Sequence, residues 1–185
     1  MLIHIAKSPK TYDGTQLSSL FAYKNFDVRG DSIAVFRGPC KVALTEMVDM
    51  EDVLAQDSIY SEDMLHFIVE HFDMDLEKTV TRQRIFVALI KELLEARGIG
   101  GILRQGDDLY RGSDKLSVSI ATLSPVSSMI HTGLNVSSRN TPVPTVSLSD
   151  LGVPDVLGFG REVAEAYAAE ISNIKAARCK VRGVG

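Results

Sequence analysis

The sequence predicts an α+β fold with a mixed, mostly antiparallel sheet flanked by helices. Short apolar and β-branched runs alternate with turn residues, whereas two longer segments, 75–100 and 160–178, have helical periodicity. These helices do not follow strands in a regular β-α-β rhythm, which argues against a purely parallel sheet. The 185 residues can bury a hydrophobic core, and we expect a single domain over residues 1–185.

The first half of the chain is predicted from short patterns. We expect a strand over 1–7, a helix over 12–26 from the spacing of its apolar residues, and a strand over 29–39 that ends at a Gly-Pro pair. Residues 40–63 are acidic and mixed, and strands and loops are assigned there. The run "MLHFIVEHF" (64–72) is typical of a buried strand.

The second half contains the clearest element, a helix over 75–100 that ends near Gly98. Its broad apolar stripe comprises Val80, Ile85, Val87, Leu89, Ile90, Leu93 and Leu94. Strands are predicted around 101–104, 107–111, 115–121 and 129–136. A Pro/Ser-rich loop (137–155) and a final amphipathic helix (160–178) complete the chain.

Composition excludes several classes of function. The formal net charge of −4 argues against a general nucleic-acid binder, which needs many phosphate-neutralising Lys and Arg side chains. No apolar run approaches the length of a membrane span. The two cysteines, Cys40 and Cys179, have no metal-site or CxxC spacing. We therefore expect a soluble cytoplasmic protein with no nucleic-acid or membrane partner.

Lys115 is the side chain that first suggests a site. In a strand over 115–121, Leu116, Val118 and Ile120 would point into the core, and Lys115 would share the other face with Ser117 and Ser119. Small residues leave space above a sheet, and a lysine beside that space can reach an anionic or carbonyl oxygen. The same spacing also fits an ordinary exposed lysine on an edge strand, which is the commoner case.

A family resemblance favours the site. "DDLYRGSDKLSVSI" resembles the hairpin of biotin protein ligases, lipoate ligases and octanoyltransferases, with Asp108-Leu109 in its first strand, Gly112 in its turn and Lys115-Leu116-Ser117 in its second. "MIHTGLNV" resembles the strand that follows in that superfamily. We expect an uncharacterised prokaryotic family within it, with its class II aminoacyl-tRNA synthetase-like architecture.

The resemblance implies roles for these residues. Lys115 would hold the acyl carboxylate or carbonyl as the catalytic cation. The substrate-binding positions would be Asp108, Gly112, Ser117, His131, Gly133 and Asn135. In the related ligases an acid reacts with ATP and Mg²⁺, and the acyl group passes to a lysine of a carrier protein. A homodimer is a further expectation.

The chain also departs from the superfamily. "DVLAQDSIYSEDM" stands where the ligases have an Arg- and Gly-rich loop, and no cysteine follows "LNV" as a thioester-forming transferase requires. Arg29 and Arg37 flank a predicted strand and could bind phosphate in place of the missing loop. The alternative is that both are surface charges.

Two further clusters predict no site. His66 and His71 lie among acidic residues but point to opposite faces of a strand, so no metal site is predicted. Asp107 and Asp108 also point to opposite faces, which argues against a carboxylate pair in acid–base catalysis.

Three functions follow. The favoured one is an acyl-protein ligase or acyltransferase-like protein that binds a small carboxylate or acyl compound with ATP. The alternative is a non-catalytic ligand-binding or dimerising module on the same fold. A synthetase-like core acting on an amino acid is the remote third.

Overall fold

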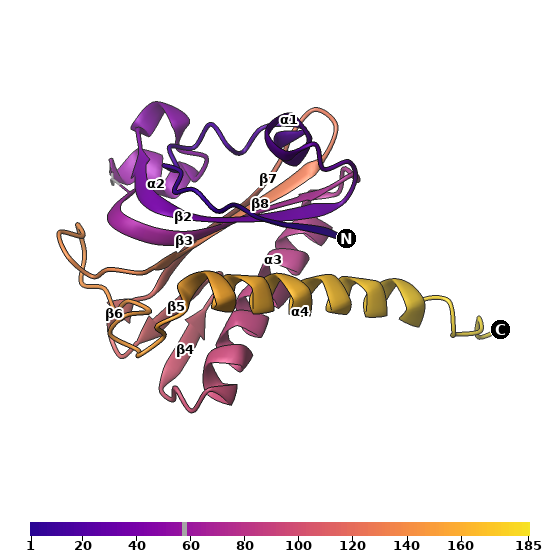
Figure 1. Cartoon of the computed structure of the whole chain (residues 1–185). Coiled ribbons are helices and arrows are strands. Elements are labelled where there is room, and N and C mark those ends of the chain that lie inside the picture. The colour runs from indigo at the N-terminus through magenta and orange to yellow at the C-terminus, as the bar shows by residue number, and fades with distance from the viewer. Residues whose placement is uncertain (57–58) are drawn as a thin grey trace.

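The computed structural model describes residues 1–56 and 59–185 and contains a five-stranded main sheet (Figure 1). Its order is β1 (Leu2–Ile5), β2 (Ser32–Val42), β3 (Ile59–His71), β8 (Ser128–Asn135) and β7 (Ser117–Leu123). Only β1 and β2 pair in parallel, and the other neighbours are antiparallel. A smaller sheet contains β4 (Ile102–Gln105), β5 (Asp108–Arg111) and β6 (Asp114–Lys115). The predicted fold class is confirmed.

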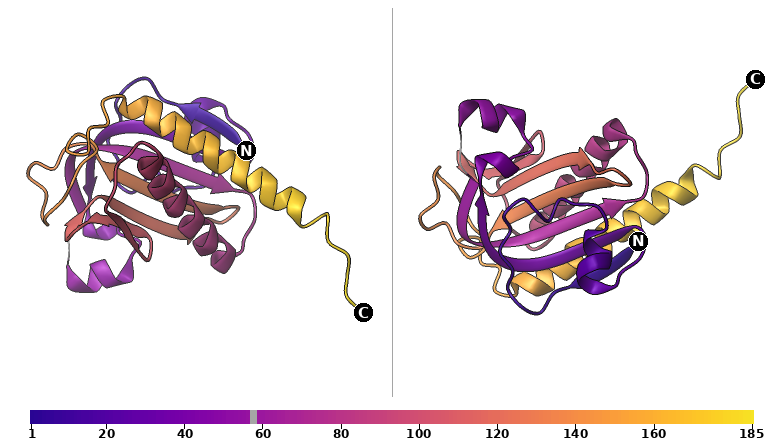
Figure 2. Two further views of the ribbon diagram at one scale, coloured as in Figure 1. Left: turned by 90° about the horizontal axis from the view of Figure 1, so that it is seen from below. Right: turned by 90° about the horizontal axis from the view of Figure 1, so that it is seen from above.

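Two long helices cover one face of the main sheet, as Figure 2 shows from below. They are α3 (Leu76–Ala96) and α4 (Val156–Ala177). Each begins at an aspartate, Asp75 or Asp155, whose side chain accepts a hydrogen bond from a first-turn N–H group. Fully buried Phe86 and Ile90 on α3 pack with Tyr167 and Val163 of α4 in the larger hydrophobic core.

The opposite face is covered by the N-terminal segment and short helices (Figure 2). These helices are α1 (Phe21–Phe26), the 3₁₀ helix η1 (Leu44–Glu46) and α2 (Met50–Ala55). A second, smaller core lies here, with Tyr12, Phe36, Met64 and Met129 among its buried members. The large helices and this second core therefore lie on opposite faces of one sheet, and the candidate site is on the second face.

The helix predicted over 12–26 is wrong for its first half, because only Phe21–Phe26 is helical. Gly14 has φ +97°, and the Asp13 carboxylate accepts hydrogen bonds from the N–H and hydroxyl groups of Thr15, so the chain turns there. Leu20 is also left-handed, with φ +65°. The extended stretch before the turn places buried Tyr12 beside Cys40 of β2.

The strand predicted over 115–121 is broken at Leu116, and this reverses the expected faces. Lys115 ends β6 in the small sheet, and β7 begins at Ser117. The hydroxyl of Ser119 accepts a hydrogen bond from Gln83 of α3, at 3.0 Å, so Ser119 points toward the helices. Val118 packs in the second core on the other face. The prediction that Val118 and Ile120 face away from the site was wrong, because the break shifts the alternation by one residue.

Other boundaries differ less. Residues 40–63, of which 57 and 58 lie outside the described residues, contain the short helices η1 and α2 besides the predicted strands and loops. Helix α4 starts at Val156, before the predicted position 160, because Asp155 caps it. Its last residues are exposed and extend beyond the sheet (Figure 1). Among the residues that the structure describes, no helix is both long and apolar enough to cross a membrane.

Candidate functional site

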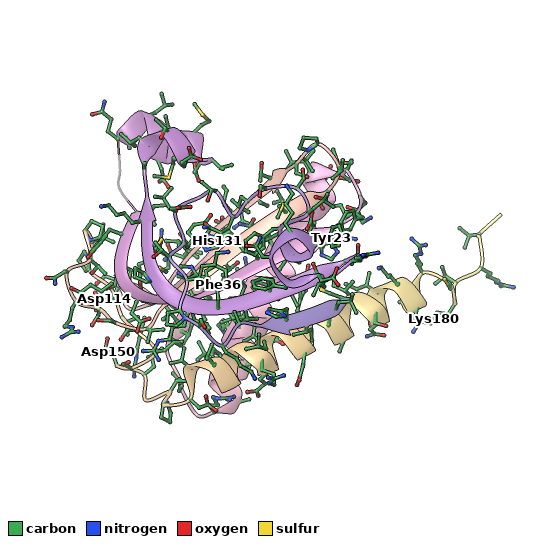
Figure 3. The ribbon with its side chains drawn as sticks, turned by 45° about the horizontal axis from the view of Figure 1, so that its top comes forward. Tyr23, Phe36, Asp114, His131, Asp150 and Lys180 are labelled. Carbon is green, nitrogen blue, oxygen red and sulfur yellow. The ribbon has the colours of Figure 1, made fainter. Side chains whose placement is uncertain are left out.

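A cavity of about 480 Å³ lies on the face of the main sheet that α3 and α4 leave free. Strands β3, β7 and β8 supply its floor, which includes Met64, Val118, Ile120 and His131. Tyr12, Leu17 and Val42 form an apolar wall, and the rim is supplied by residues 46–49, 51–52, 56, 59–60, 141–143 and 145. Figure 3 labels His131 near the centre of this face. The volume is in the range of small-molecule sites.

Lys115 reaches this cavity from β6, but it is not alone. Its Nζ lies 2.7 Å from Oδ2 of Asp108 on β5, and the two side chains are 29% and 19% exposed. The other carboxylate oxygen of Asp108, Oδ1, is buried and accepts no hydrogen bond. The β5–β6 hairpin therefore presents a coupled acid and base to the cavity, with one acceptor atom unsatisfied.

The pKa values of both members of this pair are raised. Burial raises the pKa of Asp108, against the opposing effect of the Lys115 ammonium, and nearby Asp107 and Asp52 add to the rise. Burial alone would lower the pKa of Lys115, but the Asp108 carboxylate and Asp52 raise it above its ordinary value. For Asp108 the excess of negative charge adds to the larger effect of burial, and for Lys115 this excess outweighs burial. Lys115 therefore stays charged, while Asp108 protonates more readily than a free carboxyl group.

This excess comes from the rim. Six acidic side chains line the cavity, namely Glu46, Asp49, Glu51, Asp52, Asp107 and Asp108. Among the described residues, Lys115 is the one lysine or arginine that lines it. Asp52 lies in the segment that replaces the expected Arg- and Gly-rich loop, and Glu46, Asp49 and Glu51 precede that segment directly.

His131 forms part of the buried floor. Its ring stacks on Tyr12 with 3.6 Å between ring centroids. Its Nε2 lies 3.2 Å from Nδ1 of His66, and Nε2 of His66 lies 3.1 Å from the carbonyl oxygen of Gly38. Burial lowers the pKa of His66 to about 4 and that of His131 well below its ordinary value, so both imidazoles are neutral at neutral pH.

Gly133 and Asn135 continue the floor along β8. Asn135 lines the cavity and its Nδ2 donates to the carbonyl oxygen of Lys115 at 3.2 Å, which joins β8 to the lysine's backbone. A Cβ on Gly133 would lie 2.8 Å from Cε of Met64 and 3.4 Å from a methyl group of Val118. The glycine thus leaves room at the centre of the floor.

Two of the predicted substrate-binding residues, Ser117 and Gly112, do not line the cavity. Ser117 is fully buried and its hydroxyl accepts the N–H of Leu109, so it joins β7 to β5 instead of facing the cavity. Gly112 lies in the β5–β6 turn with φ +64° and does not line the cavity. Their predicted contact with a ligand in this cavity was therefore wrong.

The predicted phosphate-binding arginines also lie apart from the cavity. Arg37 forms a bidentate pair with Asp63, with nitrogen–oxygen distances of 2.6–3.0 Å. Arg29 is exposed, stacks over the ring of Tyr23 and borders a different hollow of about 360 Å³. Neither can supply charge to a ligand beside Lys115, and this part of the prediction was wrong for this cavity.

Sequence reasoning missed Tyr12, Met64 and the acidic residues Glu46, Asp49, Glu51 and Asp52, and it considered His66 only as a metal ligand. The Asp-Gly pair after Tyr12 is a turn signal, and it could have removed the helix prediction there. Within residues 1–56 and 59–185, no group of three or more His, Cys, Asp or Glu side chains is arranged to hold a metal ion.

The sheet order, the helices on one face and the cavity on the other define a class, the biotin and lipoate protein ligase-like fold. A mutant biotin protein ligase from Aquifex aeolicus in complex with biotin is 16% identical, with a TM-score of 0.62 over 95% of this chain and 72% of that one. Protein Ta0514 from T. acidophilum, a candidate lipoate protein ligase with bound lipoic acid, is 14% identical, with a TM-score of 0.51 over 93% of this chain and 94% of that one. These similarities show the fold alone.

The chain belongs to the family DUF366, a domain of unknown function, which matches residues 1–182. The uncharacterized protein MJ0805 of Methanocaldococcus jannaschii is 41% identical over 181 residues, which are 95% of this chain and 81% of that protein. The structure of a protein of unknown function from Pyrococcus horikoshi is 40% identical, with a TM-score of 0.93 over 99% of this chain and 98% of that one. The predicted resemblance is confirmed as a family on the ligase-like fold.

Proposed function

We propose that the cavity binds a small carboxylic acid or its acyl derivative, with the carboxylate or carbonyl oxygen on Lys115. The observation that carries this proposal is the position of Nζ, partly exposed at one end of a cavity whose floor and wall are largely apolar. An apolar body and one convergent polar contact are the usual composition of a small-molecule site. The ligand oxygen would compete with the Asp108 carboxylate for the Lys115 ammonium, or both would contact it together.

Acyl transfer is the more specific candidate. A biotin protein ligase from Aquifex aeolicus in complex with biotin and ATP has the same fold, with a TM-score of 0.57 and 15% identity. By analogy, this chain would join its acid to a lysine of a carrier protein after activation by ATP and Mg²⁺. Such catalysis relies mainly on positioning and on fixed cations.

The cavity residues do not fit a bound triphosphate. Among the described residues that line the cavity, Lys115 is the one cation against six carboxylates, and Arg29 and Arg37 lie elsewhere. Phosphate groups need charged or N–H donors, and a rim of acidic side chains repels them. We therefore derive no step through ATP. The acidic rim favours the second candidate, a ligand-binding module that does not activate its acid.

Thermal unfolding with octanoate, lipoate or biotin, each alone and with ATP and Mg²⁺, tests the proposal. A ligand at about 100 times its dissociation constant stabilises the folded state by roughly 2.7 kcal/mol. We expect stabilisation by an acid alone, lost in Lys115→Gln and kept in Lys91→Gln, which removes an amine paired with Glu95 on α3.

The other outcomes separate the candidates. Stabilisation that needs both an acid and ATP, followed by labelling of a carrier protein, would establish the ligase instead of the binding module. No response to any acid up to millimolar concentration would contradict both. The dimer expected from the sequence is checked in the same samples by light scattering.

A further inference from the structure

An exposed apolar surface lies beside the cavity mouth, on the segment that contains η1 and α2. This segment, residues 44–56, is the acidic lobe, and neither of its helices has a buried residue. Leu44, Val48, Met50 and Leu54 are all exposed, and the exposed fractions of Met50 and Leu54 are 62% and 79%. Several large apolar side chains exposed so close together are typical of a surface that contacts another molecule.

The charge of the acidic lobe restricts what can cover it. The lobe carries Glu46, Asp49, Glu51 and Asp52, and it contains no lysine or arginine. All four carboxylates also line the cavity, so the lobe and the mouth share one negative surface. A partner that covers the apolar side chains must therefore bring cations beside apolar groups of its own, because like charges across an interface are unfavourable.

The chain itself contains a segment with this composition. Residues 178–185, the basic segment, follow α4 and carry Arg178, Lys180 and Arg182 without any acidic residue. Every residue of the basic segment is exposed, and Val181 beside these cations is 73% exposed. None of the described residues forms an ion pair with the three cations. The basic segment therefore has charge and apolar surface available for a contact.

The two surfaces lie too far apart to meet within one chain. In Figures 1 and 2 the basic segment extends from the end of the molecule opposite α2. Ile171 is the last buried residue of α4, so the end of this helix already projects beyond the core. When two copies lie antiparallel, each basic segment comes beside the acidic lobe of the other copy. Such a reciprocal contact is closed by a two-fold axis.

We propose that the basic segment of one copy docks on the acidic lobe of a second copy, and that two copies form a dimer through this reciprocal contact. The opposite charges select the partner, and the apolar side chains, Val181 on one copy and Met50 and Leu54 on the other, exclude water from the contact. The dimer places cations of the second copy beside the cavity mouth. These three cations are fewer than the six carboxylates that line the cavity, so the rim stays acidic.

Reversal of the charges on the basic segment tests the contact. Light scattering over a range of concentrations should give the mass of two chains for the wild-type protein. In the basic-segment variant, Arg178→Glu/Lys180→Glu/Arg182→Glu, three attractions become repulsions. The dissociation constant of the dimer should rise about tenfold or more.

A second variant reverses the charge of the acidic lobe and provides a rescue. Glu46→Lys/Glu51→Lys/Asp52→Lys should weaken the dimer in the same way, because a positive lobe repels the native basic segment. An equal mixture of the two variants should again give the mass of two chains. In that mixture each basic segment faces a lobe of opposite charge, which a general loss of folding in either variant could not produce.

Lys7→Glu/Lys24→Glu/Arg111→Glu is the matched control. It changes the net charge by the same amount as the basic-segment variant, at exposed positions outside both surfaces, and it should leave the dimer intact. A wild-type mass of one chain at every concentration overturns the inference, and so does a dimer that persists when the basic segment is reversed. Neither result bears on the binding of an acid at Lys115, which thermal unfolding measures separately.

Crosslinking locates the contact in the wild-type protein. Cys179 is exposed and Cys40 is buried, so a maleimide that carries a benzophenone labels the basic segment of the folded protein. In an equal mixture of natural and ¹⁵N-labelled chains, crosslinked peptides that join the two isotopic forms should pair residues 178–185 with residues 44–56. Crosslinks confined to one chain, or directed to another surface such as the edge strand β1, would overturn the inference.

Discussion

The ion pair between Lys115 and Asp108 determines what substitution of the lysine does to the protein. From the sequence, Lys115 stands on an open face, and its removal would be nearly neutral for folding. In the structure it neutralises a carboxylate that is only 19% exposed. The difference arises because Asp108 lies on another strand, and the register between β5 and β6 is not visible in the spacing of a single segment.

Lys115→Ala should therefore destabilise the protein by about 1–3 kcal/mol, because it leaves the Asp108 carboxylate buried without a partner. The double variant Lys115→Ala/Asp108→Asn should recover most of this loss. Chemical denaturation of both variants measures the free energy of unfolding. Lys91→Ala, which breaks an i,i+4 pair with Glu95 on α3, should change it by about 0.5 kcal/mol or less. Additive effects of the Lys115 and Asp108 substitutions would contradict the coupling.

At the residue scale, the positions of candidate site residues follow from the sequence where one strand carries the signal, and do not where the partner is distant. Lys115, His131 and Asn135 line the cavity, and Gly133 lies beside its lining residues Met64 and Val118, while their roles in binding stay predictions. Ser117 does not line it, because the break at Leu116 rotates the strand that follows. The pairing of His66 with His131 joins positions on two strands, and no local pattern encodes it.

At the scale of elements, α3 was the most predictable part of the chain. The helical spacing of its apolar residues over several turns and the glycine after it were visible in the sequence. The helix spans Leu76–Ala96. The buried face also includes polar Thr79, Arg82 and Gln83, which the apolar stripe does not indicate. Gln83 bonds to Asp107 and Ser119, so this helix also holds the hairpin beside the cavity.

Alanine substitutions on α3 should show which of its apolar side chains belong to the buried face. Ile90→Ala should lower the free energy of unfolding by about 2–5 kcal/mol, because Ile90 is fully buried in the larger core. Leu93→Ala should cost clearly less, since Leu93 is only partly buried beside that core. Urea denaturation of both variants measures the difference. A larger loss for Leu93 than for Ile90 would mean that α3 is rotated about its axis relative to this description.

The conformation of the short elements depends on tertiary contacts, which cannot be read from the local sequence. The segment before α1 has apolar residues at helical spacing, but a turn at Asp13-Thr15 and the packing of Tyr12 against β2 determine its course. Helix α2 has only six residues, and no member of it is buried. Elements of this kind have little periodicity of their own, and tertiary contacts decide their conformation.

At the scale of the whole molecule, the net charge of the chain and the charge of the side chains that line the cavity are both negative. The chain has a formal net charge of −4, and the cavity gathers six carboxylates around one lysine. An anionic ligand therefore approaches against a repulsive field, although its final contact is with a cation. The sign of this field distinguishes the cavity from one lined with arginines.

This charge arrangement predicts an unusual response to salt. Raising the NaCl concentration from about 20 mM to 300 mM shortens the screening length to below 10 Å, which weakens the long-range repulsion more than the contact at Lys115. The affinity for a carboxylic acid should therefore rise with salt, chiefly through a faster association rate. Stopped-flow binding measured across that range gives both the association and the dissociation rate.

The double variant Asp52→Asn/Glu51→Gln removes two rim charges, and its salt dependence should be weaker than that of the wild-type protein. An affinity that falls steeply with salt in the wild-type protein would instead indicate a cationic anion site and contradict the position of the carboxylate beside a mainly acidic rim.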